Sequence, residues 1–358
     1  MKKLIEWIRH HQVVAFYILT YAITWGLGFS YGGFYKQGQV LLVPLVSIAT
    51  CGPALAGIII TAVTNTQPRQ GMRKAFWIAF CVAWVVSALV FIAHTTLFNH
   101  IPLTPVLIGF IFVVVVPVAF VISMTYSRIP AVKNYLSSLI RLRGVWGWSL
   151  LGLVLTPALI LLSVLISSLL GRQPITAHQL PDTGLALIGL VTVKFFYQLF
   201  FFNATGEEVG WRGFAMPRLQ TRTSPMIAAL IMAFFWVPWH FFLWQAEGKP
   251  VWTLQFWIEE YLIHILFSVF IVWICNRATG SILVAGITHA AANTAIAFFP
   301  NLDFEVLNVT MAIVAIILII ADRMWKKLPS DHPAVYREPA LEDSLSGNIL
   351  SHSAQESI

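Results

Sequence analysis

The chain has 358 residues, of which 58% are hydrophobic, 14% aromatic and only 10% charged. Soluble globular domains carry about 25% charged residues, so this composition excludes an ordinary soluble domain and predicts a polytopic membrane protein. The net charge of +7 does not indicate a nucleic-acid partner, because the basic residues stand singly between apolar segments, where they fit membrane topology. Cys51, Cys81 and Cys275 lie scattered in apolar runs and predict neither a disulfide nor a metal site.

Apolar segments long enough to cross a bilayer recur along the whole chain. The basic N-terminal flank, MKKLIEWIRHH, precedes a long apolar stretch without a clear cleavage site, and predicts an uncleaved first span. The sequence predicts an all-α, polytopic transmembrane helix bundle of about ten spans, at 13–31, 42–64, 75–97, 104–126, 147–170, 185–207, 225–246, 254–275, 280–299 and 304–321.

The basic residues divide unevenly between the loops on the two sides of this bundle. When the loops alternate, one side receives nearly all of them and the other receives only Lys36, Arg172 and Lys249. The positive-inside rule then places both termini in the cytoplasm.

The chain divides at the basic loop 127–146. Four spans within 1–126 carry no candidate chemistry, whereas 147–300 holds all of it. Residues 301–322 form a final span. The tail, 323–358, is polar from about Pro329 and rich in Ser, Pro and acidic residues, so we expect it to be disordered and cytoplasmic.

Two adjacent carboxylates, Glu207 and Glu208, follow a strongly apolar run in NATGEEVGWRG. Glu208 and Arg212 are four residues apart, so one helix face can bring them into a bidentate ion pair. Glu207 projects from a different face and is left free to act as a general base. The alternative is that both acids only mark the interfacial end of a span.

Two further polar positions lie inside later spans. His289 and Asn293, in GITHAAANT, share a helix face and could donate to an oxyanion, or simply join two helices. His240 lies in the aromatic run FFWVPWHFFLW, and the alternative for it is an interfacial aromatic belt. Glu208 and His240 lie at equal numbers of residues before and after a turn near Thr223. In an antiparallel helical hairpin this spacing puts them at similar depth. A sixth span ending at 207 conflicts with that depth, and a longer tilted helix would remove the conflict.

Lys194 is a further ionisable group within a predicted span. Its predicted depth is comparable with that of Glu259 and Glu260, which predicts an ion pair with one of them. The alternative is that Lys194 extends to the interface while the acids face water.

In chain order the polar positions read EExxxR, an aromatic four before a histidine, and HxxxN. The matching stretches are EEVGWR at 207–212, WVPWH at 236–240 and HAAAN at 289–293. This pattern resembles the CPBP family of intramembrane proteases, also called the ABI or CAAX-protease family, which includes the type II prenyl-protein CAAX endopeptidases. The likeness covers roughly 147–300. Trp236 stands where the family usually has Phe, a departure that bears on the shape of the substrate pocket.

The resemblance implies a role for each matching residue. Glu207 and His240 would activate a water for attack on a peptide carbonyl, His289 and Asn293 would stabilise the oxyanion, and Glu208 would pair with Arg212. Glu207, His240 and His289 are also a donor set that Zn²⁺ accepts. Because a Glu/His pair can activate water directly and no HExxH motif is present, we favour catalysis without a permanent metal, commit to no cofactor and keep Zn²⁺ as the alternative.

The sequence therefore predicts an intramembrane endopeptidase acting on a membrane-associated or prenylated, CAAX-type substrate. Its expected partners are membrane lipid and a peptide or lipidated protein, with no nucleic acid. We expect a bacterial plasma-membrane location with an active site open to the cytoplasmic side. A proton-coupled transporter and a non-catalytic immunity or scaffold protein are the alternatives. The polar residues fall in one half of the chain, whereas carriers often have paired halves.

Overall fold

The computed structural model describes residues 2–36, 45–172, 174, 181, 183–299 and 301–337. All regular secondary structure within these ranges is helical, which confirms the predicted fold class. The helices are α1 (Lys2–His10), α2 (Gln12–Lys36), α3 (Leu45–Thr50), α4 (Gly52–Thr64), α5 (Arg73–Ala93), η2 (His94–Phe98), α6 (Pro105–Val114), α7 (Val116–Ser123), η3 (Met124–Tyr126), α8 (Pro130–Leu136), η4 (Ser137–Leu139), α9 (Trp146–Leu169), α10 (Gly184–Gln198), η5 (Leu199–Ala215), α11 (Met216–Leu219), α12 (Pro225–Trp239), α13 (Phe241–Ala246), α14 (Leu254–Arg277), α15 (Ile282–Phe298) and α16 (Phe304–Ala321).

Eight helical segments in the described ranges are long and apolar enough to cross a membrane. They are Gln12–Phe29, Arg73–Phe98, Pro105–Tyr126, Trp146–Leu169, Gly184–Leu219, Pro225–Ala246, Leu254–Arg277 and Phe304–Ala321. Two more apolar helices, α4 and α15, are shorter. Each predicted span therefore contains a helix, although 42–44, at the start of the second, lie outside the described residues. The number of true spans and the side of each terminus stay predictions.

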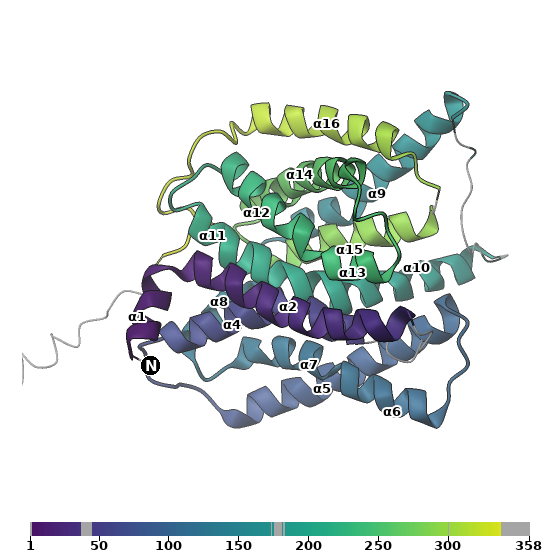
Figure 1. The fold of residues 1–358 in the computed structure, drawn as a ribbon. Coiled ribbons are helices and arrows are strands. Elements are labelled where there is room, and N and C mark those ends of the chain that lie inside the picture. Colours follow the sequence, from purple (N-terminus) through teal and green to yellow (C-terminus); the bar gives the residue numbers. More distant parts are fainter. Residues whose placement is uncertain are drawn as a thin grey trace, which may run out of the picture.

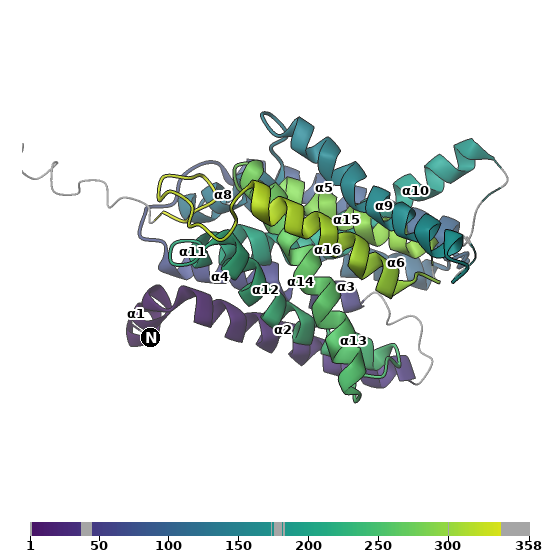
Figure 2. The same cartoon turned by 90° about the horizontal axis from the view of Figure 1, so that it is seen from above.

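The helices form a broad bundle with apolar outer faces. Figure 1 shows α16 along one edge and α5 and α6 along the opposite edge, and Figure 2 shows α2 and α9 on opposite sides of the bundle. Ile313, Ile316, Ile317 and Ile320 on α16 are each more than half exposed. An apolar face of this kind is expected where lipid, not water, surrounds the protein.

The sixth predicted span is longer than expected. Helices α10, η5 and α11 run without a break over Gly184–Leu219, 36 residues, whereas the prediction ended this span at 207. The apolar run does end near Glu207, but the polar side chains that follow are buried in protein, so the helix continues. This is the long helix that the depth argument required. Its central part, η5, is π-helical, a wider winding that occurs frequently at functional sites.

Small residues let the neighbours of η5 approach it closely. A Cβ atom on Gly210 would lie 2.4 Å from Pro53 of α4, and one on Gly286 of α15 would lie 2.5 Å from the Ala204 side chain. Both distances are below van der Waals contact, so these glycines are required by packing. As a result η5 is held tightly between α4 and α15, with Glu207 and Glu208 in the interior.

Contacts tie the N-terminal helices to the later ones. The Trp239 indole donates a hydrogen bond to the Thr24 hydroxyl at 2.9 Å, and the Thr50 hydroxyl donates to the Phe201 carbonyl at 3.1 Å. The division at 127–146 stays a prediction, but the two parts share buried hydrogen bonds. The helices that carry Thr24 and Thr50, α2 and α3, thus form part of the scaffold around α12 and η5.

The C-terminal segment beyond α16 differs from the disordered tail expected for 323–358. Its described part, up to residue 337, packs against α11: the Arg218 guanidinium lies 3.6 Å from the Phe214 ring centroid and 3.8 Å from that of Tyr336. Gln220 also donates to the Ala334 carbonyl at 2.9 Å. These stacking and hydrogen-bonding contacts order a polar segment that composition alone marks as disordered. Residues 338–358 lie outside the described residues.

Candidate active site

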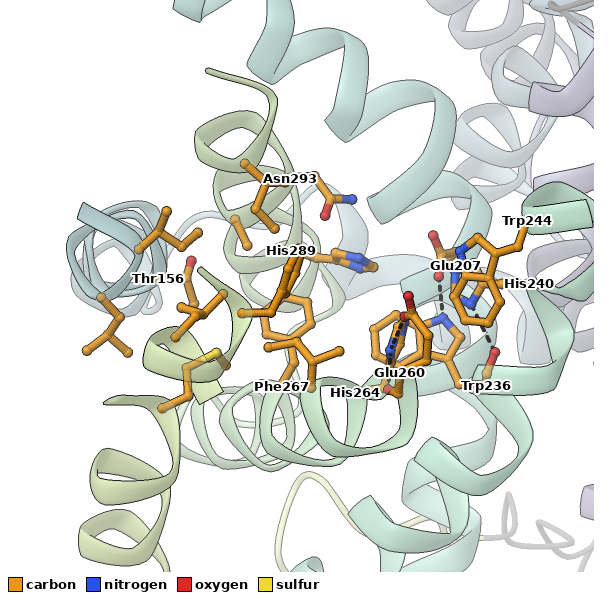
Figure 3. A pocket seen from close by; sticks show the side chains of 18 residues that line it. Thr156, Glu207, Trp236, His240, Trp244, Glu260, His264, Phe267, His289 and Asn293 are labelled. Atoms are coloured by element: carbon orange, nitrogen blue, oxygen red, sulfur yellow. Dashed lines mark hydrogen bonds and ion pairs between the residues drawn. The ribbon is translucent and has the colours of Figure 1, made fainter. Parts of the chain in front are cut away.

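A cavity of about 290 Å³ opens among α9, η5, α12, α13, α14, α15 and α16. Four predicted site residues, Glu207, His240, His289 and Asn293, line it, and Figure 3 shows the His289 and Asn293 side chains pointing toward Glu207 and His240. Most of the other lining residues are apolar or aromatic. The structure therefore brings together three segments that are up to 86 positions apart in the chain, from Glu207 to Asn293.

Glu208 and Arg212 form a fully buried ion pair beside the cavity. Arg212 Nη1 lies 3.0 Å from Glu208 Oε1, and neither side chain has exposed surface. Arg212 Nη2 also donates to Ser268 Oγ of α14 at 3.3 Å. In surroundings without water each charge needs a partner, so the pair neutralises both groups, and the Arg212–Ser268 bond joins η5 to α14.

Glu208 also holds His289. His289 Nδ1 lies 2.8 Å from Glu208 Oε1, the same oxygen that accepts from Arg212. An ionised carboxylate can only accept, so Nδ1 carries the hydrogen and Nε2 is left for the cavity. Glu208 thus orients the imidazole in addition to neutralising Arg212. The sequence predicted the ion pair but did not predict this second contact.

Glu207 carries no ion pair in the described structure, yet it is not free. The Trp236 indole Nε1 donates to Glu207 Oε2 at 2.6 Å, and the glutamate is 4% exposed. The Glu207 side chain lines the cavity, where its second oxygen is the one left for a water molecule. This arrangement can orient a nucleophilic water and receive its proton.

His240 lies at the break between α12 and α13, next to Pro238. Its Nδ1 lies 3.1 Å from the Trp236 carbonyl oxygen, which can only accept, so Nδ1 donates and Nε2 is the basic nitrogen. The Trp244 ring stacks on the imidazole, with ring centroids 4.9 Å apart. His240 therefore presents a fixed acceptor to the cavity that Glu207 also lines.

Asn293 is connected to a residue that the sequence did not single out. Its Nδ2 donates to Asn203 Oδ1 at 3.5 Å, and Asn203 is completely buried on η5, four residues before Glu207. An amide within an apolar run is a signal that could have drawn attention to this position.

Glu260 and His264 also line the cavity, and sequence reasoning did not assign them to the site. His264 Nδ1 lies 2.7 Å from the Glu260 carbonyl oxygen and 3.4 Å from its carboxylate. The His264 ring lies 4.9 Å from the Trp236 ring and 5.2 Å from that of His240, measured between centroids. The available signal was two ionisable residues four apart within one apolar helix.

Lys194 does not form the predicted ion pair with Glu259 or Glu260. Its Nζ lies 3.3 Å from His94 Nε2 and 4.3 Å from the Phe98 ring centroid, at the contact of α10 with η2. The prediction failed because it compared depth only and did not foresee that η2 packs against α10. An imidazole lone pair and an aromatic face hold this ammonium group in place of a carboxylate.

The described residues contain no group of three His, Cys, Asp or Glu side chains placed to hold a metal ion. Both predicted histidines keep a nitrogen that could bind a metal, because Nε2 of His240 and of His289 remains open. Glu207 accepts from Trp236 at one oxygen only, and His289 contacts Glu208 through Nδ1, so these bonds leave one oxygen and two nitrogens of the predicted donor set open. The described side chains are not gathered into a metal-binding group, and no step below is derived through a metal.

Comparisons with known proteins agree with the motif pattern. Residues 189–295 match a family model described as type II CAAX prenyl endopeptidase Rce1-like. A protein of Methanococcus maripaludis named CAAX prenyl protease 2 is 32% identical over 162 residues, which is 44% of this chain and 55% of that protein. The chain thus spans about half the length of the curated relative that it matches. The predicted resemblance is confirmed, and the matched segment contains all three motifs.

Proposed function

We propose that the chain is an intramembrane endopeptidase that hydrolyses a peptide bond of a membrane-associated or prenylated, CAAX-type substrate. One observation supports it above all others: Glu207, His240, His289 and Asn293 line a single cavity within a helical membrane bundle. A carboxylate, a basic imidazole and two possible donors are the groups that amide hydrolysis needs.

In the proposed reaction Glu207 and His240 activate a water molecule. The water oxygen attacks the carbonyl carbon as its proton passes to Glu207 or to His240 Nε2. A new C–O bond forms and the carbonyl oxygen takes the negative charge. The C–N bond then breaks, and the amine leaves with the proton that the site took from water. Atoms and charge balance without a further reactant.

His289 and Asn293 stabilise the oxyanion in this scheme. His289 Nδ1–H is engaged by Glu208, so a hydrogen on Nε2 makes the ring an imidazolium that can donate into the cavity. Asn293 supplies its amide N–H. Donors that are already oriented need no reorganisation as charge develops, and one such donor contributes about 10²- to 10³-fold to the rate.

The charges of the buried groups support this division of roles. Glu207 and Glu208 carry two negative charges when ionised, and Arg212 supplies one positive charge. An imidazolium at His289 makes the set neutral, as a buried site requires. When Glu207 takes the proton of water, the negative charge passes to the substrate oxyanion, and His289 remains its counter-ion. The site stays neutral throughout the reaction.

The test compares wild type with Glu207→Gln in liposomes, using an internally quenched peptide that ends in a farnesylated Cys-aliphatic-aliphatic-X sequence. We expect Glu207→Gln to lower kcat by about 10²- to 10⁴-fold, because a general base is lost. The matched control is Glu259→Gln, the same substitution on an exposed carboxylate that hydrogen-bonds Gln255. Equal turnover by wild type and Glu207→Gln would refute Glu207 as the base, and wild-type turnover no higher than that of protein-free liposomes would favour a transporter or a non-catalytic protein.

The same assay tests the metal alternative. We expect dialysis against a strong chelator to leave turnover within about twofold of the untreated enzyme, since the Glu207/His240 pair activates water itself. Loss of activity on chelation that returns with added Zn²⁺ would show that the donor set rearranges around an ion.

A further inference from the structure

We propose that Trp236 is a positioning residue for Glu207: its indole N–H fixes one carboxylate oxygen and leaves the other to meet water. The inference rests on the proposed function, because it assigns how the general base of that reaction is held. Trp236 is the residue at which this chain departs from the phenylalanine usual in the resembled motif, and phenylalanine has no N–H to donate.

The contact has the geometry of a strong hydrogen bond. Trp236 Nε1 donates to Glu207 Oε2 at 2.6 Å, and both side chains are buried, with 1% and 4% of their surface exposed. Among the described residues it is the one hydrogen bond made by the Glu207 side chain. A bond donated to a carboxylate favours its ionised form, which is the form that accepts a proton from water.

The indole is itself held from several sides. The Arg212 guanidinium carbon lies 4.6 Å from the Trp236 ring centroid, and that guanidinium is fixed by Glu208. The edge-on rings of His264 and His289 lie 4.9 and 5.2 Å away. A cation over the face of indole draws electron density toward itself, which makes the N–H a better donor.

Trp236 therefore connects two glutamates that have no direct bond. Glu208 fixes Arg212, Arg212 covers the indole face, and the indole N–H fixes Glu207. The Glu208–Arg212 ion pair thus restricts the motion of Glu207, whose carboxylate would otherwise rotate about its terminal torsion. This assigns the ion pair a part in orienting the base.

The test is the pH dependence of peptide hydrolysis by Trp236→Phe, with the farnesylated quenched peptide as probe. We expect kcat to fall about 10- to 100-fold, the effect of one hydrogen bond to a charged group, with KM little changed. The acid limb of kcat/KM should move about one pH unit upward, because the carboxylate loses the donor that favours its ionised form.

The matched control is Trp211→Phe. Trp211 is completely buried, but its Nε1 has no hydrogen-bond partner among the described residues, and its ring packs on Phe16 and is not one of the side chains that line the cavity. The Trp211→Phe substitution removes the same atoms as Trp236→Phe without removing a hydrogen bond. If Trp236→Phe does not fold, replacement of the Trp236 indole by its benzothiophene isostere removes the N–H and keeps the ring shape.

The other titratable or charged groups around Glu207 do not change between these variants. They are Glu208 and Arg212 on η5, His240 after α12, Glu260 and His264 on α14, and His289 on α15.

A displaced acid limb in Trp236→Phe or the benzothiophene variant, with the wild-type limb in Trp211→Phe, supports the inference. An unmoved limb in an active, folded Trp236→Phe overturns it and leaves the proposed function intact. Wild-type protein without Glu207-dependent hydrolysis overturns the proposed function first.

Discussion

The buried ion pair of η5 provides the most quantitative test of the fold around the site. In Arg212→Leu, Glu208 would remain fully buried with a negative charge and no cation except a protonated His289. The variant also loses the bond to Ser268 and the cation over Trp236. Removing one partner of a buried pair costs about 3–5 kcal/mol, so we expect the free energy of unfolding to fall by that amount.

The double variant Glu208→Leu/Arg212→Leu separates stability from activity. Replacing both partners by apolar side chains removes the unpaired charge, so it should recover most of the lost stability. It should stay inactive, because His289 Nδ1 also loses its acceptor. A stable but inactive double variant would show that the Glu208–Arg212 pair is needed for catalysis apart from its part in stability.

Reversible unfolding in mixed detergent micelles measures these changes. The control is Arg172→Leu, which removes a partly exposed arginine from its pairs with Asp303 and Glu305 and should change unfolding far less. The reasoning fails if Arg212→Leu lowers the free energy of unfolding by less than about 1 kcal/mol, or if the double variant is no more stable than the single one.

Two further predictions concern packing and a surface charge. Gly210→Ala should lower the free energy of unfolding by about 1–3 kcal/mol, because its Cβ would overlap Pro53. Gly189→Ala, at a position on α10 where an added Cβ meets no other atom, should be neutral or stabilising. Equal effects of the two substitutions would contradict the packing argument. Hydrogen bonds from Arg277, aided by one from Trp273, hold the pKa of Asp322 below its usual range. The contribution of ionised Asp322 to stability is complete above its pKa in the unfolded state, near 4, and is lost as pH falls through its lower pKa in the folded state. Asp322→Asn should therefore lower Tm at pH 7 but not in strong acid.

Local spacing was sufficient to predict the parts of the site that lie within one helix. Glu208 and Arg212 pair because they are four residues apart, and composition was enough to predict a helical membrane bundle. Counting residues on each side of one turn predicted a similar depth for Glu208 and His240. These predictions need only helix geometry and the cost of burying charge.

Contacts between distant segments could not be obtained in this way. The position of His289 on Glu208 joins residues 81 positions apart, and Lys194 meets His94 across 100 positions. Spacing within one helix says nothing about which neighbouring face it meets, so depth alone gave Lys194 the wrong partner. His264 was missed for the same reason, since only the packing of α14 against α12 brings it to the cavity.

Charge neutrality explains why so many polar residues gather at one place in an apolar chain. A single buried carboxylate would be neutralised by a proton and could not act as a base. Glu208, Arg212 and His289 form a set in which Glu207 can be ionised at no net charge, and the Trp236 N–H adds a hydrogen bond to that state. Glu207→Gln therefore leaves a net positive site, which would attract anions while hydrolysing peptide far more slowly. A peptide with a carboxylate at the cleavage position should therefore bind Glu207→Gln more tightly than the wild type. The measurement compares its inhibition constant for the wild type with its dissociation constant for Glu207→Gln.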